Sequence, residues 1–496
     1  MVYLIGGVCI HLTMRHRYQT ILNVVGVFCI LYSISLIPPM GISVYFADGE
    51  FKDFFLTFLI LLSAGYILTL FFKISSRNLR RKDGFLIVAL FWLILSLTGS
   101  LPFWTGWHLD FIDSFFEATS GITTTGATVI THLDFIPPSI LYYRQQLQFL
   151  GGMGLIVMAI AVLPLLGIGG LQLYQAETPG PMKEERLSPR LDSTVRNLCL
   201  IYLGLTISCA VAYWISGMQP LEALEHSYAT VSTGGFSTHD ESLGFYKNDA
   251  IYLVAIVFMI FGAINFGVHF SALNKGEIYN YFKDTETRTF LIFIIFFTLL
   301  LSIILYLSHF YSNPLDAGLN SLFETTSVLT STGFGITDFS VWPLFLPIMM
   351  IFISFIGGCG GSTAGGIKVI RILTLLKQGA NELFLLVHPK GIRHVKIGNR
   401  ILNNRIVQSI WGFFAVYIVI YAILTLMMIG AGMDQVTAFS AVAACINNLG
   451  PGLGDVSVSF STASDMEKLL SVFAMLLGRL EIFTFLVILT PDFWSS

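Results

Sequence analysis

The stretch Glu324-Thr-Thr-Ser-Val-Leu-Thr-Ser-Thr-Gly333-Phe334-Gly335 carries the strongest structural signal in this chain, because a short, moderately apolar segment ends there in a glycine turn. A helix needs about twenty apolar residues to cross the hydrocarbon core of a bilayer, and this segment has far fewer. Non-helical backbone is tolerated at membrane depth only where protein or a water-filled cavity surrounds it. The stretch therefore predicts a half-helix that enters a membrane and ends in a loop beside a cavity.

The same pattern recurs at three other places in the chain. The other copies are Glu117-Ala-Thr-Ser-Gly-Ile-Thr-Thr-Thr-Gly126, Glu225-His-Ser-Tyr-Ala-Thr-Val-Ser-Thr-Gly234 and the more divergent Ala441-Val-Ala-Ala-Cys-Ile-Asn-Asn-Leu-Gly450. Three copies place a glutamate nine residues before the aligned glycine, and successive glycines lie 108, 99 and 117 residues apart. Self-similarity at such a period indicates repeated structural units. Each unit is predicted to contain a span, a half-helix, a loop and a second span.

Composition indicates that lipid is the main solvent of the chain. Of its 496 residues, 55% are hydrophobic and 11% are charged, whereas soluble domains carry about a quarter charged residues. The net charge of −3 suggests no nucleic-acid partner. Apolar runs long enough to span a bilayer are Ile21–Phe46, Phe54–Phe72, Phe85–Phe103, Phe290–Tyr306 and Ile410–Ile429.

The predicted fold class is an all-α polytopic membrane protein with four M1–P–M2 repeats (span, pore helix, filter loop, span). These repeats surround one pseudo-fourfold pore, and two extra N-terminal spans precede them, which gives ten spans. The predicted divisions are residues 1–13 as an N-terminal extension of unassigned role, 14–76 as the two extra spans, and 77–182, 183–284, 285–390 and 391–496 as pore repeats 1 to 4.

Charge in the connections predicts the orientation. The segments just after the glycine turns are almost free of lysine and arginine and hold Asp134, Asp240, Glu241, Asp338 and Asp455. Basic residues gather in the loops on the other side, which the positive-inside rule assigns to the cytoplasm. We therefore expect the glycine turns to face outward and both termini to lie in the cytoplasm. The basic residues include Arg77, Arg80, Arg81, Lys82, Lys183, Arg186, Arg190, Arg196, Lys283, Arg288, Lys377, Lys390, Arg393 and Arg405.

The four loops have the chemistry of a cation filter. Backbone carbonyls can replace the hydration shell of a cation when short extended loops turn them toward one axis, and Ser331–Gly335 closely resembles the TVGYG pattern of potassium-channel filters. Each half-helix can also aim its negative C-terminal end at the ion. The predicted K⁺-binding residues are Thr124, Thr125, Gly126, Ser232, Thr233, Gly234, Ser331, Thr332, Gly333, Asn448, Leu449 and Gly450.

A second glycine cluster, Gly357-Gly-Cys-Gly-Gly-Ser-Thr-Ala-Gly-Gly366, follows the third filter loop. One interpretation is a continuous helix that packs closely against its neighbours through small residues. The alternative is an unwound segment that lines the pore, because each glycine costs a helix about 1 kcal/mol relative to alanine. In that case the segment would lie below the filter as a gate. The predicted gate residues are Gly357, Gly358, Gly360, Gly361, Gly365, Gly366 and Arg479.

Other charged residues inside apolar runs also require an interpretation. Arg479 either pairs with Glu481 or faces the pore, where its charge would repel cations and contact the gate. Lys368 and Arg371 are expected to extend toward the cytoplasmic membrane surface. The repeated glutamates (Glu117, Glu225 and Glu324) are expected at the beginnings of their half-helices, where a carboxylate favours the helix dipole.

Several motifs resemble those of the Trk/Ktr/HKT superfamily of potassium transporters, and the two extra spans resemble its bacterial TrkH branch. The resemblance extends from about Met14 to the C-terminus and covers all four repeats. The motifs are Thr123-Thr-Thr-Gly-Ala-Thr128, Gly234-Gly-Phe-Ser-Thr-His-Asp240, Asn447-Asn-Leu-Gly-Pro-Gly-Leu-Gly454 and Gly478-Arg-Leu-Glu481.

This resemblance implies a multi-pass protein of the bacterial inner membrane that conducts K⁺ and has no cofactor of its own. It also implies a homodimer in lipid with one pore per subunit, assembled on a cytosolic TrkA-type ring that binds nucleotides. Within the superfamily, serine in place of the first filter glycine accompanies sodium permeation. All four aligned glycines are present here, which favours potassium.

Two other classes of function remain open from the sequence. A proton- or sodium-coupled symporter of the same superfamily would also use broken helices and internal repeats. An intramembrane enzyme is the remote alternative, since Ser237, His239 and Asp240 are triad residue types. Their closeness in sequence does not favour a nucleophile–base–orienter line.

Overall fold

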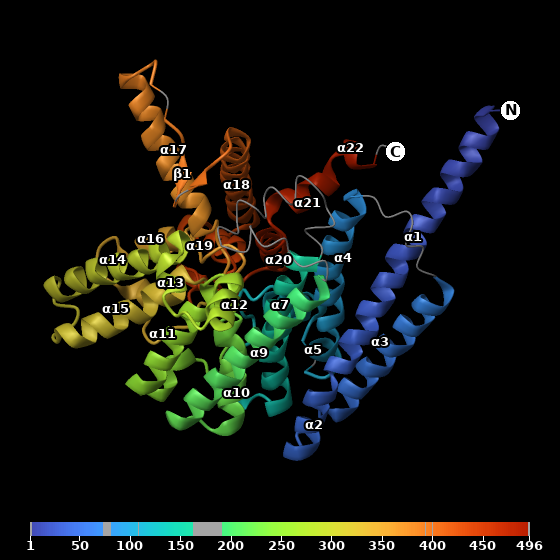
Figure 1. The fold of residues 1–496 in the computed structure, drawn as a ribbon. Helices are drawn as coiled ribbons and strands as arrows, with labels where there is room; N and C mark the ends of the chain where they lie inside the picture. Colours follow the sequence, from blue (N-terminus) through green and yellow to red (C-terminus); the bar gives the residue numbers. More distant parts are fainter. Residues whose placement is uncertain are drawn as a thin grey trace.

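The computed structural model describes residues 2–72, 81–107, 109–161, 191–391, 393–398 and 400–494. These residues are mostly helical, as predicted (Figure 1). The strands in this part of the chain are β1 (Lys396–Ile397) and β2 (Arg400–Ile401), which form a short antiparallel pair.

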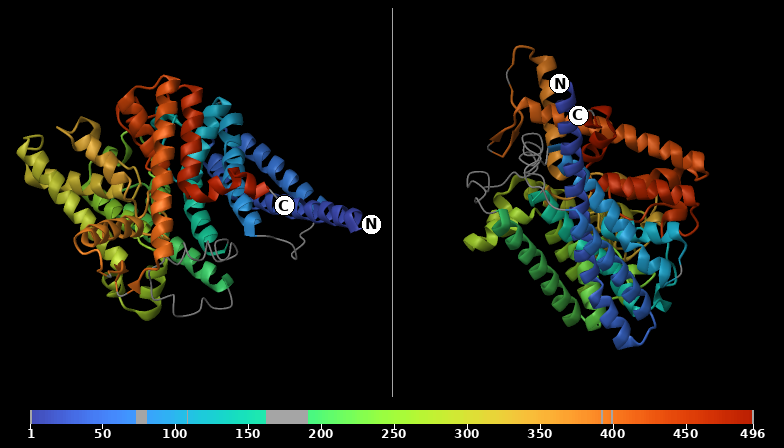
Figure 2. Two further views of the ribbon diagram at one scale, coloured as in Figure 1. Left: turned by 90° about the horizontal axis from the view of Figure 1, so that it is seen from above. Right: turned by 90° about the vertical axis from the view of Figure 1, so that its right-hand side faces the viewer.

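The N-terminal part is a helical hairpin that lies along one flank of the molecule (Figures 1 and 2). A Cβ atom on Gly65 would lie 2.7 Å from the carbonyl oxygen of Gly26, so these glycines allow the two long helices to approach closely. The predicted extension continues into the first predicted span within one helix, and the second part of that span forms a separate short helix. The elements are α1 (Val2–Ser35), α2 (Ile37–Phe46) and α3 (Phe51–Phe71).

Four successive units follow, and each contains a long helix, a half-helix and a second helix. The first unit contains α4 (Arg81–Gly99), α5 (Leu101–Thr105), α6 (Phe111–Ile122) and α7 (Pro138–Ala161). The second contains α9 (Leu191–Ile215), α10 (Pro220–Val231), α11 (Asp249–Ala263), α12 (Phe266–Lys275) and α13 (Asn280–Lys283). The third contains α14 (Thr285–Leu307), α15 (Pro314–Leu329), α16 (Leu346–Ser354) and α17 (Val369–Val387). The fourth contains α18 (Asn404–Ala431), α19 (Gln435–Ile446), α20 (Asp465–Arg479), α21 (Ile482–Leu489) and α22 (Pro491–Trp494).

The half-helices α6, α10, α15 and α19 lie where the sequence repeats predicted them. Local signals fix where they begin: Pro314 starts α15 after the cap Asn313, and the Asp434 side chain accepts a hydrogen bond from Thr437 N at the start of α19. A short 3-10 turn follows each filter loop, so the repeat extends beyond the glycine. These turns are η1 (Leu133–Phe135), η3 (Ser242–Tyr246), η4 (Phe339–Val341) and η5 (Gly454–Val456).

The number of spans depends on how broken helices are counted. Within the described residues, 6 helices are long and apolar enough to cross a membrane, or up to 8 if each bent pair is one span. The pair α11 and α12 is bent by 97°, and the pair α20 and α21 by 111°. The second span of the first unit is the polar α7, and that of the third unit is divided into α16 and α17. Neither is among the helices counted above, so the total of ten spans stays a prediction.

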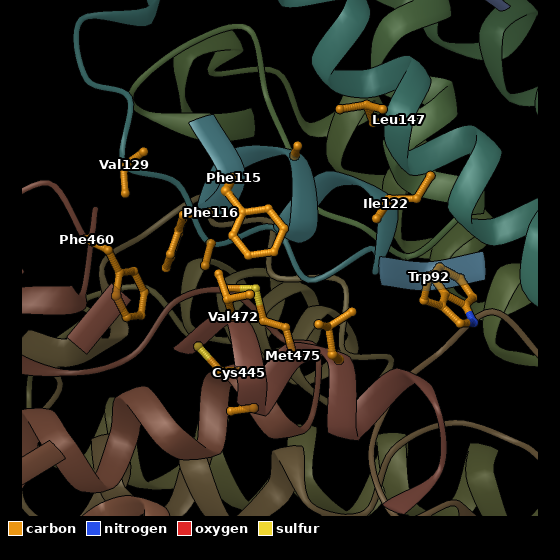
Figure 3. Close-up of a cluster of buried hydrophobic side chains, with 14 of the residues drawn as sticks. Trp92, Phe115, Phe116, Ile122, Val129, Leu147, Cys445, Phe460, Val472 and Met475 are labelled. Atoms are coloured by element: carbon orange, nitrogen blue, oxygen red, sulfur yellow. The ribbon is translucent and has the colours of Figure 1, made fainter. Parts of the chain in front are cut away.

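The first and fourth units pack against each other and bring the two ends of the repeat series together. The rings of Phe116 and Phe460 have centroids 5.2 Å apart, and Figure 3 shows Val472 and Met475 of α20 in the same buried cluster. Buried aromatic and aliphatic side chains of this kind supply much of the packing energy. The units therefore form a closed arrangement rather than an open row.

Candidate functional site

The four filter loops share one backbone conformation. In each loop a non-glycine residue has a φ of 51–53°, and the glycine two residues later has a φ between 77° and 99°. Positive φ is uncommon outside glycine, so four occurrences at equivalent places indicate one repeated loop fold. The pairs are Thr124 and Gly126, Thr233 and Gly235, Ser331 and Gly333, and Asn448 and Gly450.

This shared conformation corrects the sequence alignment of the second loop by one residue. Gly235, not Gly234, is equivalent to Gly126, Gly333 and Gly450. Hydrogen bonds confirm the register, because Gly234 N donates to Ala229 O (2.7 Å) as Thr125 N donates to Ser120 O (2.8 Å). Gly234 therefore stays in the loop but holds the place of Thr125. The shift was hidden in sequence because Glu225 lies nine residues before Gly234, the same spacing as in the first and third loops.

The loops form a ring in which each is in close contact with the next. A Cβ atom on any of the four equivalent glycines would lie 2.7 Å or less from a carbonyl oxygen of the neighbouring loop. Only glycine allows backbones to approach this closely. The contacts are Gly126 with Gly234 O, Gly235 with Thr332 O, Gly333 with Leu449 O, and Gly450 with Thr125 O. The last contact closes the ring between the fourth and first loops.

Side-chain hydrogen bonds stabilise the loops, and the pattern of these bonds differs from loop to loop. Thr123 and Thr125 share a 2.7 Å hydroxyl contact in the first loop, and Thr330 and Thr332 share one of the same length in the third. In the fourth loop, Asn448 Nδ2 donates to Thr125 Oγ1 (2.9 Å) and so joins that loop to the first. The predicted filter residues are therefore brought together, although by different contacts.

The glutamates do not act as predicted on the helix dipole. Glu117 and Glu324 lie beyond the first turns of α6 and α15, and their carboxylates accept hydrogen bonds from the backbone after the filter. Glu117 accepts from Val129 N (3.0 Å), and Glu324 accepts from Ile336 N (2.8 Å). These carboxylates anchor the backbone that leaves the filter loops, and the dipole interpretation is wrong for them.

The register shift also changes the second member of the glutamate series. His226, not Glu225, holds the place of Glu117, and its Nε2 lies 3.0 Å from Ser237 Oγ after the second loop. An imidazole therefore replaces a carboxylate as the anchor. The adjacent Glu225 is part of α10 as well, but its place in the repeat is one residue earlier.

A buried ion pair joins the first and second loops. Arg144 of α7 and Glu117 of α6 are 1% and 0% exposed, and Arg144 Nε lies 2.8 Å from Glu117 Oε1. Arg144 also donates to Ser237 O (3.0 Å) and Thr128 Oγ1 (3.2 Å). Arg144 was not among the predicted site residues, although an arginine inside a predicted membrane span is a rare feature that could have identified it.

The glycine cluster Gly357–Gly366 is an irregular segment between α16 and α17, so the interpretation as a continuous packed helix is wrong. The segment is largely buried and is hydrogen-bonded to the C-terminal ends of half-helices and to the filter loops that follow them in the second, third and fourth units. A Cβ atom on Gly365 would lie 2.0 Å from Asn447 O, which shows how tightly the segment fits. The hydrogen bonds are Gly366 N to Asn447 O (3.1 Å), Gly365 N to Ser331 Oγ, Thr363 Oγ1 to Val231 O (3.1 Å) and Thr233 Oγ1 to Thr363 Oγ1 (3.3 Å).

Arg479 is buried and points toward this segment. Its guanidinium donates to Thr363 O (2.9 Å) and to Gly151 O (3.4 Å), and it lies 5.5 Å from the ring centroid of Trp92. The alternative pairing with Glu481 is not what the structure shows, because Glu481 pairs with Arg371 (2.9 Å).

The two basic residues at the start of α17 also point inward. Arg371 is buried against Glu481 and the ring of Phe413, and Lys368 Nζ donates back to Ala364 O in the glycine segment. The prediction that they extend to the membrane surface is therefore wrong.

Glu286 is a further residue that the sequence analysis missed. It is fully buried at the start of α14, and its Oε1 accepts hydrogen bonds from Gly360 N (2.8 Å) and Ile370 N (3.2 Å). One carboxylate thus fixes both the glycine segment and the beginning of α17. A carboxylate in the first turn of a long span was the available signal.

The triad residue types do not form a catalytic line. His239 Nδ1 contacts Asp134 Oδ1 (2.5 Å), whereas Asp240 accepts from Leu133 N (3.2 Å). Ser237 Oγ accepts from the backbone N of His239 (3.2 Å) and contacts His226. These side chains connect the segments after the first two loops.

Comparison with known proteins agrees with this architecture. A family model described as TrkH, cation transport protein, matches residues 50–495. The chain belongs to the TrkH family. It is 47% identical over 484 residues to the Trk system potassium uptake protein TrkH of Vibrio parahaemolyticus, with 97% of this chain and 100% of the relative covered. It is 43% identical over 482 residues to the protein of the same name from Escherichia coli K12, with the same shares covered.

A solved structure shows the same TrkH fold. The crystal structure of the potassium transporter TrkH from Vibrio parahaemolyticus matches with a TM-score of 0.90 and 45% identity, covering 96% of this chain and 100% of that chain. The predicted family and fold class are therefore confirmed. The chain is a membrane transport protein rather than an enzyme.

Proposed function

We propose that this chain is the potassium-conducting subunit of a Trk-type uptake system. The observation that carries this proposal is the closed ring of four loops, each with the same backbone and each in contact with the next. Such a ring can present several carbonyls to one desolvated cation. The relatives are named as potassium uptake proteins, which supports K⁺ as the preferred ion.

The surroundings of the ring favour a cation over an anion. All four half-helices end at the filter loops, so their negative C-terminal ends lie beside it. We propose K⁺ binding at the twelve filter residues that the sequence predicted, three in each loop. The membrane potential is sufficient to drive uptake, because 100 mV is worth about 2.3 kcal/mol per charge, or roughly a fiftyfold concentration ratio.

Gly357–Gly366 is proposed as the gate, with Arg479 as its positively charged partner. The segment contacts the inner ends of the filter loops, and the Arg479 guanidinium donates to Thr363 O within it. A plug held by backbone hydrogen bonds and a fixed positive charge would stop cations below the filter. Release of these contacts would open the path.

Assembly and location complete the proposal. The relatives are named as members of a Trk system. We propose a homodimer in the bacterial inner membrane, with both termini cytoplasmic and a cytosolic TrkA-type nucleotide-binding ring as regulator. The chain itself would need no cofactor.

Reconstitution of the purified full chain in liposomes tests this function. With a potassium gradient and sodium as the competing ion, the reversal potential should follow the Nernst potential for K⁺. A reversal potential that moves with an imposed proton or sodium gradient would instead support the coupled symporter. Equal permeation of K⁺ and Na⁺ would contradict a potassium filter.

A further inference from the structure

Gln148 of α7 belongs to the first repeat but binds the backbone of the second filter loop. The residue is fully buried, and both ends of its amide are used. Its Nε2 donates to Gly234 O (2.6 Å), and its Oε1 accepts from Phe236 N (3.1 Å). A single side chain from the first repeat therefore fixes the backbone on both sides of Gly235, the glycine of the second loop.

The amide also occupies a space that a side chain fills in the other loops. The position of Gly234 is held by Thr125, Thr332 and Leu449 elsewhere, so the second loop alone has no side chain there. A Cβ atom on Gly234 would lie 2.4 Å from Gln148 Cδ. The Gln148 amide thus stands where the side chain of the loop itself would otherwise begin.

Arg144, one turn earlier on α7, also binds the second loop. It donates to Ser237 O (3.0 Å), and its guanidinium lies 4.3 Å from the ring centroid of Phe236. The carbonyl that Gln148 holds is also the one against which Gly126 packs, at 2.3 Å from the place of a Cβ. Movement of the Gly234 carbonyl would therefore disturb the contact between the first and second loops.

We propose that Gln148 is a specificity-determining residue, which supplies in space the side chain that Gly234 lacks and so sets the position of the second loop's carbonyls. This inference rests on the proposed function of the ring as a potassium filter. Small displacements of coordinating carbonyls alter the balance between K⁺ and Na⁺. Gln148 acts through the backbone and does not itself coordinate the ion.

Replacement of the amide is the first test. Gln148→Leu removes both hydrogen bonds and so releases the Gly234 carbonyl from its fixed position, which should lower the K⁺/Na⁺ permeability ratio roughly tenfold. The measurement is the reversal potential in liposomes, with the melting temperature of the purified protein as a check on folding. Gln146→Leu is the matched control, because Gln146 lies on the same helix and donates to Ser35 O, away from the filter. Its ratio should equal that of the parent protein.

A double substitution separates this role from general packing. Gly234→Thr alone should clash with Gln148 and lower the ratio, whereas Gly234→Thr with Gln148→Ala returns the side chain to its own loop. Gly234 lies outside the left-handed region, so threonine is sterically possible there. The double variant should recover a ratio closer to the parent's than either Gly234→Thr or Gln148→Leu.

The outcomes distinguish the inference from the proposed function. Parent selectivity that is retained in a folded Gln148→Leu protein would overturn the role of Gln148. If Gln148→Leu does not fold, a double variant no better than Gly234→Thr would overturn it as well. A parent protein with no preference for K⁺ would overturn the proposed function and, with it, this inference.

Discussion

At the scale of single residues, the buried pair of Arg144 and Glu117 should be one of the costliest interactions to break. Both side chains are fully buried, so removing one charge leaves the other without compensation. Arg144→Leu should lower the free energy of unfolding by about 3–5 kcal/mol. Thermal or denaturant unfolding of the purified protein measures this loss.

An exposed ion pair provides the control for that experiment. Lys283 and Glu277 have side chains 58% and 53% exposed and lie 3.7 Å apart. Lys283→Ala should cost at most about 1 kcal/mol. Equal losses for Arg144→Leu and Lys283→Ala would show that burial does not govern the Arg144 pair.

Residue types predicted the filter loops but not their register. Threonine–glycine pairs located three of the loops and the aligned glycine Gly450 located the fourth, because glycine and small polar residues are what such a turn requires. In the second loop, however, two adjacent glycines made both registers acceptable in sequence. The hydrogen bond from Gly234 N to Ala229 O decides between them, and that bond depends on packing.

At the scale of elements, the glycine segment should lose its fit when a methyl group is added at Gly365. That methyl group would lie 2.0 Å from Asn447 O, and this oxygen belongs to the backbone, which cannot move aside as easily as a flexible side chain. If the closed state loses about 1.4 kcal/mol, the open population rises about tenfold. Gly365→Ala should therefore raise potassium flux into liposomes by roughly this factor.

Gly379→Ala is the matched control, because Gly379 lies in the following helix α17 and a Cβ there meets nothing within 4 Å. Its flux should equal that of the parent protein. Unchanged flux in a folded Gly365→Ala protein would contradict the role of the segment as a gate.

The glycine content of this segment favoured an interrupted helix, since glycine weakens helices, but it left a continuous, closely packed helix open as the other interpretation. Its partners could not be predicted in the same way. Glu286, Asn447 and Ser331 come from distant parts of the chain, and only the folded arrangement brings them to the segment.

At the scale of the whole molecule, the N-terminal hairpin is attached to α7 of the first repeat by polar contacts. Asp48, between α2 and α3, accepts from Ser139 N (3.1 Å) at the start of α7. The hydroxyl groups of Tyr32 and Tyr143 lie 2.5 Å apart. The hairpin therefore stabilises the helix that carries Arg144 and Gln148.

The attachment through Asp48 should weaken in acid. Burial raises the pKa of Asp48, but hydrogen bonds from Ser43 and Ser139 outweigh it and hold the pKa below its usual value. A lowered pKa contributes stability above the ordinary value of about 3.9, and this stability is lost as the pH falls through the lowered pKa. The melting temperature should therefore fall more between about pH 5 and pH 3 in the parent than in Asp48→Asn. Parallel decreases in the two proteins would contradict this assignment.

The overall architecture was predictable because hydropathy and the positions of the half-helices are local properties of the sequence. The broken helices were harder to recognise: α20 and α21 form one apolar run, yet they meet at 111° beside Glu481. The bend follows from Glu481, whose φ is 54° and whose carboxylate pairs with Arg371 of another helix.

The ring of four loops has a consequence for how such a pore can vary. In a channel of four identical subunits, one substitution changes all four filter loops at once. Here a substitution alters one loop directly, and contacts such as that between Gly126 and Gly234 O connect this loop to its neighbour. Single substitutions during evolution can therefore change ion preference in small steps. The different residues at one equivalent position of the loops, Gly234, Thr125 and Leu449, are an example of such divergence.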